Sequence, residues 1–127
     1  MVIALVDSSV VIDLLRGYPN AIAWYSTQID LGISRIVWLE VVEGAPNQQK
    51  QRQAIQFLRT FAQTIEIEPA DGVWALTQLM KFHLSHNVDA FDCLIASASA
   101  RLNIPLYTRN LKHFAPLLGS MAQVPYV

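Results

Sequence analysis

Five consecutive apolar residues near the start of the chain, positions 2–6 (VIALV), give way at once to the polar triplet Asp7-Ser8-Ser9. A continuous apolar run of this length is typical of a strand that is buried on both faces, as the strands of parallel sheets are. Residues 10–15 then carry apolar side chains at helical spacing, with Ser8 and Ser9 available as N-caps. A strand that turns directly into a helix predicts an α/β fold.

The remainder of the chain continues this alternation. Further strands are predicted at residues 31–34, 65–67, 104–107 and 124–127. Further helices are predicted at residues 21–29, 36–42, 48–60, 73–84 and 89–102, with a polar turn at residues 108–114. We therefore expect an α/β sandwich around a mainly parallel sheet, in which ligands bind beyond the carboxyl ends of the strands, where the strand order reverses.

Length and composition narrow the class of protein. With 127 residues, the chain suits a single domain covering residues 1–127. Cys93 is the only cysteine, which excludes a disulfide framework, and an apolar content of 53% excludes intrinsic disorder. No apolar window approaches the length of a membrane span and no cleavable leader is recognisable, so we expect a soluble protein of the cytoplasm.

Charge and hydropathy bear on the possible partners. The net charge of −1 means that the overall field does not attract nucleic acid, so any such binding must be local. A mean hydropathy of +0.30 predicts exposed apolar surface unless something covers it. Two explanations stay open: strands that are apolar on both faces, or a surface for a second copy or another partner.

Three acidic side chains lie where carboxylates are unusual. Asp7 directly follows the first predicted strand, Glu40 lies among the apolar residues of the helix at 36–42, and Asp92 lies near the start of the most apolar helix. Buried carboxylates need a partner or a metal ion, and no lysine or arginine is within four positions of any of the three. If the three converge, their mutual repulsion raises their pKa values, and a divalent cation relieves it.

The ligand types indicate which metal such a site would take. Carboxylate oxygens without a cluster of cysteine and histidine favour Mg²⁺ or Mn²⁺ over zinc. His83 and His86 are three positions apart and suited to pair on a helix, but a solvated helical face is the simpler explanation. A metal ion held by carboxylates in an open cleft polarises a phosphoryl oxygen and activates water.

Each acid also has an ordinary structural explanation. Asp7 is well placed to cap the first helix. Glu40 would be a surface residue if the helix had another phase, and Glu43 would then take its place. Asp92, like Asp89, is favoured near a helix N-terminus by the helix dipole. The spacing alone leaves these alternatives open.

Three blocks of the sequence resemble, in order, those of PIN-domain ribonucleases, in particular VapC-type toxins: residues 6–17 (VDSSVVIDLLRG), 32–44 (GISRIVWLEVVEG) and 90–114 (AFDCLIASASARLNIPLYTRNLKHF). In the second block the acid lies four residues before a glycine, which selects Glu40 over Glu43. In the third block an aspartate precedes an apolar-Ile-Ala run, which selects Asp92 over Asp89.

The resemblance implies a three-layer α/β/α fold and a Mg²⁺- or Mn²⁺-dependent endoribonuclease acting on tRNA or another structured RNA. It also implies the toxin of a type II toxin–antitoxin pair, a homodimer whose acidic cleft is covered by a small antitoxin, with no role at a membrane. In the family's pattern Asp7 and Asp92 are the primary metal ligands. Glu40 completes the acidic set and positions or deprotonates the attacking water.

The turn after the predicted strand at 104–107 departs from the family's pattern. It reads Thr108-Arg109-Asn110, so Asn110 occupies the position of a frequent fourth acid, and His113 stands where some relatives have another. With one negative charge fewer, the resemblance supports one bound metal ion more strongly than two. Asn110 is still expected to act at the site, because its amide can orient a water or a metal-bound ligand.

Contacts to RNA phosphates are expected from Arg16, Arg109 and Lys112, since each follows an element that ends near the predicted cleft. The alternative is that these three residues are ordinary solvated charges.

Two other classes of function stay open. A non-catalytic PIN-like module that docks a partner is favoured by the missing fourth acid. A receiver-type signalling domain would need paired acids after the first strand and a late lysine, where this chain has serines and Arg109.

Overall fold

Strand β1 (Ala4–Val6) lies at the centre of a five-stranded, wholly parallel sheet in the computed structural model, which describes all residues 1–127. The strand order is β3-β2-β1-β4-β5. The other strands are β2 (Leu31–Ser34), β3 (Gln63–Ile65), β4 (Leu106–Tyr107) and β5 (Ala122–Gln123). All three residues of β1 are buried, which explains why its sequence is apolar without alternation.

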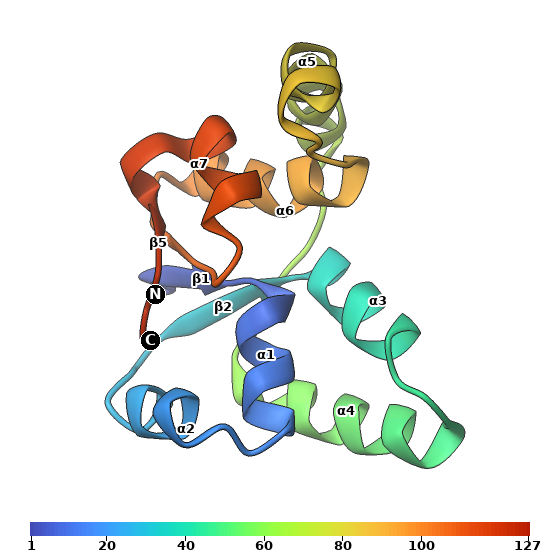
Figure 1. The fold of residues 1–127 in the computed structure, drawn as a ribbon, viewed down its shortest axis with the longest axis vertical. Helices are drawn as coiled ribbons and strands as arrows, with labels where there is room; N and C mark the ends of the chain where they lie inside the picture. Colours follow the sequence, from blue (N-terminus) through green and yellow to red (C-terminus); the bar gives the residue numbers. More distant parts are fainter.

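Helices cover both faces of this sheet, so the predicted three-layer α/β/α architecture is confirmed (Figure 1). The helices are α1 (Ser8–Leu15), α2 (Pro19–Tyr25), α3 (Arg35–Glu43), α4 (Gln48–Phe61), α5 (Pro69–His86), α6 (Ala90–Leu102) and α7 (Leu111–Leu118). Helices α5, α6 and α7 lie on one face, above the sheet in Figure 1, and α1, α2 and α4 lie on the other. Helix α3 begins directly after β2 and contacts α1, α4 and α6.

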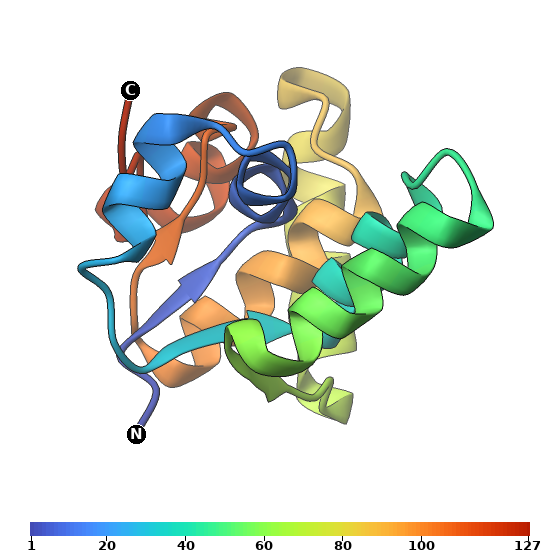
Figure 2. The same ribbon diagram turned by 90° about the horizontal axis from the view of Figure 1, so that it is seen from below.

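The strand order reverses at β1. The chain moves from β1 to β2 and β3 on one side, then returns to place β4 and β5 on the other side. The chain leaves the carboxyl ends of β1 and β4 toward opposite faces of the sheet, and the position between the two loops, where sheets of this kind bind ligands, is here called the crevice. Their first residues are adjacent, since the Asp7 backbone N–H donates to the Tyr107 carbonyl at 2.9 Å. Figure 2 shows β1 running directly into α1 at this point.

Close packing in the sheet explains the glycine in β2. A Cβ atom at Gly32 would lie 2.7 Å from Cγ1 of Val2 and 2.9 Å from Cδ2 of Leu5. These distances are shorter than van der Waals contact, so only glycine lets β1 and β2 keep their spacing here.

The sequence-based prediction is wrong at residues 108–114, where it expected only a polar turn. Helix α7 begins at Leu111 and continues to Leu118. Pro116 lies inside the helix and removes one backbone hydrogen bond. The buried side chains of Phe114, Leu117 and Leu118 offset that loss by packing against the core.

Other boundaries differ by a few residues. The helix expected at 21–29 is α2, which ends at Tyr25 because the hydroxyls of Ser26 and Thr27 donate 2.7 Å hydrogen bonds to carbonyls three residues earlier. The strand expected at 65–67 is β3, at Gln63–Ile65. The strand expected at 124–127 is wrong, because those residues form no strand; the edge strand β5 lies before them, at Ala122–Gln123, and ends ahead of Pro125.

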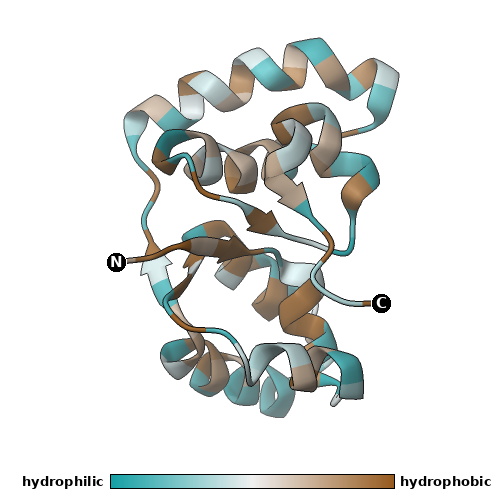
Figure 3. Cartoon of the chain, turned by 90° about the vertical axis from the view of Figure 1, so that its left-hand side faces the viewer, coloured by the Kyte–Doolittle hydropathy of each residue, from teal (hydrophilic) through white to brown (hydrophobic).

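Helix α5 leaves a row of large apolar side chains in solvent. Val73, Leu76, Met80 and Leu84 recur at helical spacing and are between 59% and 96% exposed. Figure 3 shows the molecule coloured by hydropathy, with apolar segments in the strands and further apolar positions on the outer helices. No helix combines the length and the apolar character needed to cross a bilayer. Part of the apolar excess therefore lies on the surface.

Candidate functional site

Asp7 lies at the carboxyl end of β1 and is only 3% exposed. It is the N-cap of α1, which confirms the capping role considered for Asp7 and not the one considered for Ser8 and Ser9: its Oδ1 accepts the backbone N–H of Ser8 at 2.7 Å. Oδ2 accepts the hydroxyls of Ser9 and Thr108, each at 2.8 Å. The carboxylate is therefore both a helix cap and a fixed group at the crevice.

Glu40 approaches Asp7 from α3. The hydroxyl of Ser8 donates to Oε1 of Glu40 at 2.9 Å and also lies 3.3 Å from Oδ1 of Asp7. One serine thus joins the two acidic side chains from β1 and α3. Glu40 is partly buried, whereas Glu43 on the same helix is exposed, so the phase of α3 selects Glu40 as the residue that faces the crevice.

Asp92 reaches the same region from the first turn of α6 and is 7% exposed. It forms a capping box with Asp89: the Asp92 N–H donates to Oδ1 of Asp89 at 2.8 Å, and the Asp89 N–H donates to Oδ2 of Asp92 at 3.1 Å. Oδ2 of Asp92 also lies 3.2 Å from Nδ1 of His113 on α7. Asp89 is exposed, so the buried acid of this pair is Asp92.

Asn110 and His113 form the side of the site that β4 and α7 supply. The Asn110 backbone N–H donates to Oγ1 of Thr108 at 2.9 Å, which fixes the turn beside Asp7. The Asn110 side-chain nitrogen lies 3.0 Å from Nδ1 of His113. These two residues are therefore in contact with each other, and through His113 with Asp92.

The three acids influence one another electrostatically. The pKa of Glu40 is raised to about 7, first by burial and then by the negative charges of three aspartates, against the lowering effect of the Ser8 hydrogen bond. Those aspartates are Asp7, Asp92 and Asp89. The pKa of Asp92 is also raised, mainly by burial, while His113 opposes the rise. A carboxylate with a pKa near 7 can accept a proton from water at neutral pH.

No lysine or arginine forms an ion pair with Asp7, Glu40 or Asp92. Arg101, the cation nearest in sequence to Asp92, binds the buried Asp71 instead, with Nε 3.0 Å from Oδ1. The concentration of negative charge at the crevice is therefore relieved by hydrogen bonds and by the contact of Asp92 with His113.

The side chains gathered here suit a hard divalent cation, because most of their possible ligand atoms are carboxylate oxygens. The others are the amide of Asn110 and the imidazole of His113. In this conformation no three side chains of the histidine, cysteine, aspartate or glutamate type are close enough together to hold one ion. Asp92 and His113 are at the separation of neighbouring ligands, and Asp7 and Glu40 are joined through Ser8. The residues therefore fit such an ion by their chemistry, and the side chains would have to move closer together to bind one.

A family model for the PIN domain matches residues 4–115. This chain belongs to the PIN domain family. The resemblance to VapC-type PIN domains is thereby confirmed, and the receiver-type alternative is excluded. A search of curated proteins finds no significant match.

Solved structures similar to this PIN domain include several from toxin–antitoxin systems. A chain of a toxin–antitoxin complex from Klebsiella pneumoniae is 26% identical, with a TM-score of 0.77, and the alignment covers 97% of this chain and 98% of that one. A chain of DNA-bound VapBC from Salmonella typhimurium is 15% identical, with a TM-score of 0.78 and 98% of both chains covered. Mycobacterium tuberculosis VapC20, a sarcin-ricin loop cleaving toxin, is 14% identical, with a TM-score of 0.71 over 84% of this chain and 89% of that one.

The three basic residues considered for RNA binding differ in their surroundings. Arg109 is engaged within this PIN domain: Nη1 lies 3.0 Å from Oδ2 of Asp13, and the guanidinium contacts the rings of Tyr18 and Tyr126. Arg16 follows α1 and lies at the surface, as does Lys112 in the first turn of α7. Neither forms an ion pair, so these two are the free positive charges of the set.

The sequence analysis missed the polar side chains that hold the acids in place. Ser8, Ser9 and Thr108 together make the hydrogen bonds that fix Asp7 and Glu40. The sequence did contain a signal for these three residues, because each follows a strand at the carboxyl edge of the sheet, where a ligand was expected. Asp13 and Tyr126, which hold Arg109, are far apart in sequence and gave no signal. The Asp71–Arg101 pair was also missed.

Proposed function

We propose that this PIN domain is a Mg²⁺- or Mn²⁺-dependent endoribonuclease and the toxin of a type II toxin–antitoxin pair. The observation that carries the proposal is the arrangement of Asp7 and Glu40 around the Ser8 hydroxyl, with the charge of Asp92 raising the pKa of Glu40 and no lysine or arginine paired with any of the three. Helix capping accounts for Asp7 and Asp92 but not for the half-buried Glu40 beside them. The family supports nuclease activity, and the VapC20 relative cleaves an RNA loop.

The residues have separable roles in this proposal. Asp7 and Asp92 hold the divalent ion, and Glu40 completes the acidic set. A bound divalent ion supplies electrostatic stabilisation of the charge that develops on the phosphate. Glu40, with its pKa raised to about 7, accepts the proton of the attacking water. Ser8 fixes the orientation of Glu40 through its 2.9 Å hydrogen bond, and Asn110 orients a water or phosphate oxygen with its amide.

RNA binding is assigned to the exposed cations beside the crevice. Arg16 and Lys112 contact phosphates of tRNA or another structured RNA. Arg109 adds to the positive potential, but its charge is partly compensated by Asp13. With so few basic groups, about two to four phosphates are neutralised per protomer and the salt dependence is shallow.

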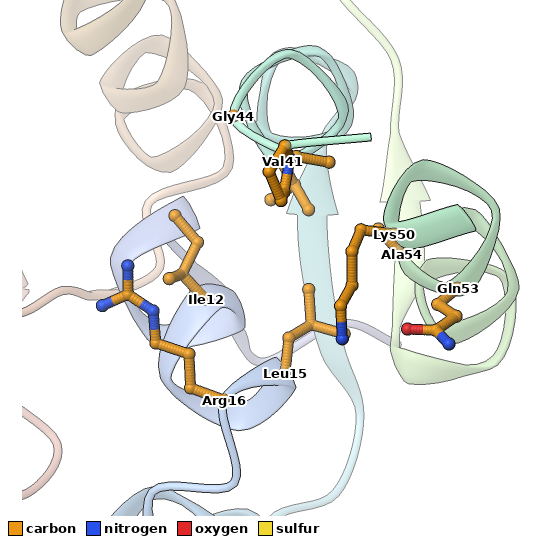
Figure 4. A pocket seen from close by; sticks show the side chains of 10 residues that line it. Ile12, Leu15, Arg16, Val41, Gly44, Lys50, Gln53 and Ala54 are labelled. Carbon is orange, nitrogen blue, oxygen red and sulfur yellow. The ribbon is translucent and has the colours of Figure 1, made fainter. Parts of the chain in front are cut away.

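The proposed antitoxin has a suitable docking surface beside the acidic site. A groove of about 470 Å³ lies between α1, α3 and α4, with apolar side chains and the cations Arg16 and Lys50 along it. Figure 4 shows Lys50 extending from α4 into the space between α4 and α1. A segment carrying both apolar and acidic side chains complements this groove. Ile12 lines the groove one helical turn from Ser8, so a segment lying here reaches the acids and covers them.

A second copy of the chain is the proposed partner of α5. The exposed row Val73, Leu76, Met80 and Leu84 is apolar, and the ends of α5 differ in charge. Glu68 precedes the helix, whereas Lys81 is in its C-terminal half. An antiparallel pair of α5 helices in a two-fold dimer therefore buries the apolar row and brings opposite charges together.

The enzyme proposal is tested by cleavage of a labelled structured RNA with Mg²⁺ or Mn²⁺. Asp7→Asn and Asp92→Asn are expected to lose cleavage by at least about a thousandfold while keeping the circular dichroism of the parent. Glu43→Gln, an exposed change on the helix that carries Glu40, is the matched control and keeps the parent rate. Cleavage at the parent rate by either aspartate variant would make the non-catalytic module the correct alternative.

A further inference from the structure

Helix α4 lies in a segment of the chain that is basic, although the protein as a whole is slightly acidic. Residues 44–65 include three basic side chains, those of Lys50, Arg52 and Arg59, and no aspartate or glutamate. All 10 acidic residues lie outside this segment, together with the other six of the 9 basic residues. The net charge of −1 therefore conceals a local charge of +3, and a nucleic acid could bind this protein only at such a local charge.

The three cations of α4 are not paired within the protein. Among the lysines and arginines, ion pairs engage only Arg35, Arg101 and Arg109. A solvated helix ordinarily carries both signs of charge, three or four residues apart, so that its side chains stabilise one another. The other polar residues of α4 are instead a threonine and five glutamines. The positive charge of α4 is therefore free to interact with a partner outside the protein.

Four exposed polar side chains run along one side of α4 and are here called the basic stripe: Gln49, Arg52, Gln56 and Arg59. They recur at intervals of three and four residues and therefore share one face of the helix. The buried residues of α4 lie on its other side: Ala54, Leu58 and Phe61. No residue of the stripe lines the groove between α1, α3 and α4. In Figure 1, α4 lies at the end of the molecule away from α5, so the stripe is also separate from the proposed dimer face.

The composition of the stripe favours a nucleic acid over a protein as its partner. Apolar and aromatic side chains anchor most protein–protein interfaces. None of the large apolar side chains exposed in this protein belongs to α4. Arginine and glutamine side chains, in contrast, donate hydrogen bonds to the phosphate oxygens of nucleic acids. The stripe therefore has the chemistry of a surface that binds a phosphate backbone.

The helix also holds the two arginines of the stripe at a fixed separation. Arg59 lies seven residues after Arg52, which corresponds to about 10 Å along the helix axis. The packing of Leu58 and Ala54 against the core keeps this helix in place. Two rigidly spaced cations suit a partner whose phosphates are also regularly spaced, as in double-helical RNA, which proteins recognise by its shape and backbone.

We propose that the basic stripe binds the phosphate backbone of a double-helical arm of the RNA, apart from the crevice where the strand is cut. The inference rests on the proposed ribonuclease function and adds a second contact surface for the substrate. Arg16 and Lys112 contact the RNA beside the crevice, whereas Arg52 and Arg59 contact it on α4. The protein thereby recognises the shape of the RNA as well as the strand at the crevice.

The test measures binding of a fluorescent RNA hairpin with a long duplex stem, in comparison with a short single-stranded RNA. Anisotropy titrations at several salt concentrations give the slope of log K against log salt, and EDTA prevents metal-dependent cleavage. The variants are Arg52→Gln, Arg59→Gln and the two combined. Lys81→Gln on α5 removes another exposed, unpaired cation and is the matched control. Circular dichroism and light scattering check the fold and the mass of each variant.

Each single variant of the stripe should reduce the salt slope for the hairpin by about 0.9, because one phosphate contact is lost. The double variant should reduce the slope by about 1.8 and weaken hairpin binding about tenfold at physiological salt. Replacing both arginines by lysine should restore the slope, since lysine retains the charge that contacts phosphate. Binding of the single strand should be close to that of the parent in every variant, and Lys81→Gln should match the parent with both RNAs.

Three results would overturn the proposal: an unchanged hairpin slope in the double variant, an equal loss in Lys81→Gln, or an equal loss with the single strand. Weaker binding of the antitoxin with unchanged binding of the hairpin would assign the stripe to a protein partner instead. None of these results affects the cleavage assay of the proposed nuclease. Conversely, a parent that binds the hairpin through the stripe and never cleaves RNA would remove the nuclease and keep the stripe, so the two failures are distinguishable.

Discussion

The Ser8 hydroxyl donates to Glu40 Oε1 at 2.9 Å and thereby connects the N-terminus of α1 with α3 at the acidic crevice. Ser8 is also next to Asp7, whose Oδ1 lies 3.3 Å from the same hydroxyl. The side chain thus fixes the distance between two carboxylates that repel each other.

Removing this hydroxyl tests its positioning role. Ser8→Ala is expected to lower kcat/KM for RNA cleavage about tenfold, which corresponds to roughly 1.4 kcal/mol. The acidic limb of the pH–rate profile moves to higher pH, because the Ser8 hydrogen bond lowers the pKa of Glu40. In a protein that already carries Glu40→Gln, adding Ser8→Ala should change kcat/KM very little, because the Glu40 carboxylate that accepts the Ser8 hydrogen bond is already replaced. An additive loss in the double variant contradicts this coupling.

The pKa of Glu40 predicts how stability changes with pH in the absence of metal. Its pKa is about 7 in the folded protein and has an ordinary value of 4.5, so the folded state binds the proton more tightly. Its contribution to stability is therefore complete below about pH 4.5 and is lost as the pH rises through 7, by on the order of 2 kcal/mol. Urea unfolding at several pH values in EDTA measures this loss.

Two comparisons isolate the contribution of Glu40. Glu40→Gln should flatten the stability profile between pH 4.5 and 7.5, whereas Glu43→Gln should leave it unchanged. Added Mn²⁺ should raise the Tm of the parent more at pH 7.5 than at pH 5, because protons compete with the ion at low pH. An equal rise at both pH values argues against ion binding at these carboxylates.

The buried ion pair between Asp71 and Arg101 should contribute to stability and leave the chemistry unaffected. Asp71 is 2% exposed, and its carboxylate also accepts the Glu68 backbone N–H. Arg101→Ala is expected to cost about 3 kcal/mol in the free energy of unfolding, because it leaves a buried charge unpaired. Arg35→Ala breaks an exposed pair with Glu66 and should cost less than about 1 kcal/mol. Cleavage per folded molecule should equal that of the parent in both.

The groove between α1, α3 and α4 is tested by reversing one charge. Lys50→Glu should weaken binding of the cognate antitoxin at least about tenfold, because the proposed segment carries acidic side chains. Arg52→Glu is the control, since this exposed residue is on the same helix but does not line the groove. Binding is measured by calorimetry and RNA cleavage is assayed in parallel. Equal weakening by both variants would indicate a general charge effect and not docking in the groove.

The proposed dimer face is tested on α5. Met80→Glu places a charge in the middle of the apolar row and should convert a dimer to a monomer in light scattering. Ser85→Glu, on another side of the same helix, should leave the mass unchanged. A monomeric parent at micromolar concentration would remove α5 as a self-association face.

The α/β architecture could be predicted from local sequence patterns, but the ends of several helices and strands depend on tertiary packing. The apolar run of β1 is a local signal, and so is Ser34 before α3, whose hydroxyl accepts the Ile36 backbone N–H; both elements lie where the sequence indicated. Helix α7 was missed because the polar residues Lys112 and His113 before Phe114, and Pro116 within the helix, resemble a turn. The buried contacts of Phe114 and Leu117 that stabilise it are long-range and carry no local pattern.

The sequence pointed to the acids of the candidate site, whose role stays a prediction, but not to the contacts that hold them. Asp7 and Asp92 stand at element starts next to apolar segments, which marks them in the sequence. Contacts such as Ser8 with Glu40 and Thr108 with Asp7 join residues 32 and 101 positions apart. No spacing rule reaches that far, because only the sheet order brings β1 and β4 together.

The hydrogen bond from Thr108 to Asp7 has a consequence for biosynthesis. A nascent chain that has emerged only as far as α6 has Asp7, Glu40 and Asp92 but lacks the loop that immobilises Asp7. Ser8 and Ser9 already hold this carboxylate from the start of α1, and the last of its contacts forms only when β4 docks beside β1. The first strand of the chain and its fourth therefore have to pair before Asp7 reaches its final set of hydrogen bonds.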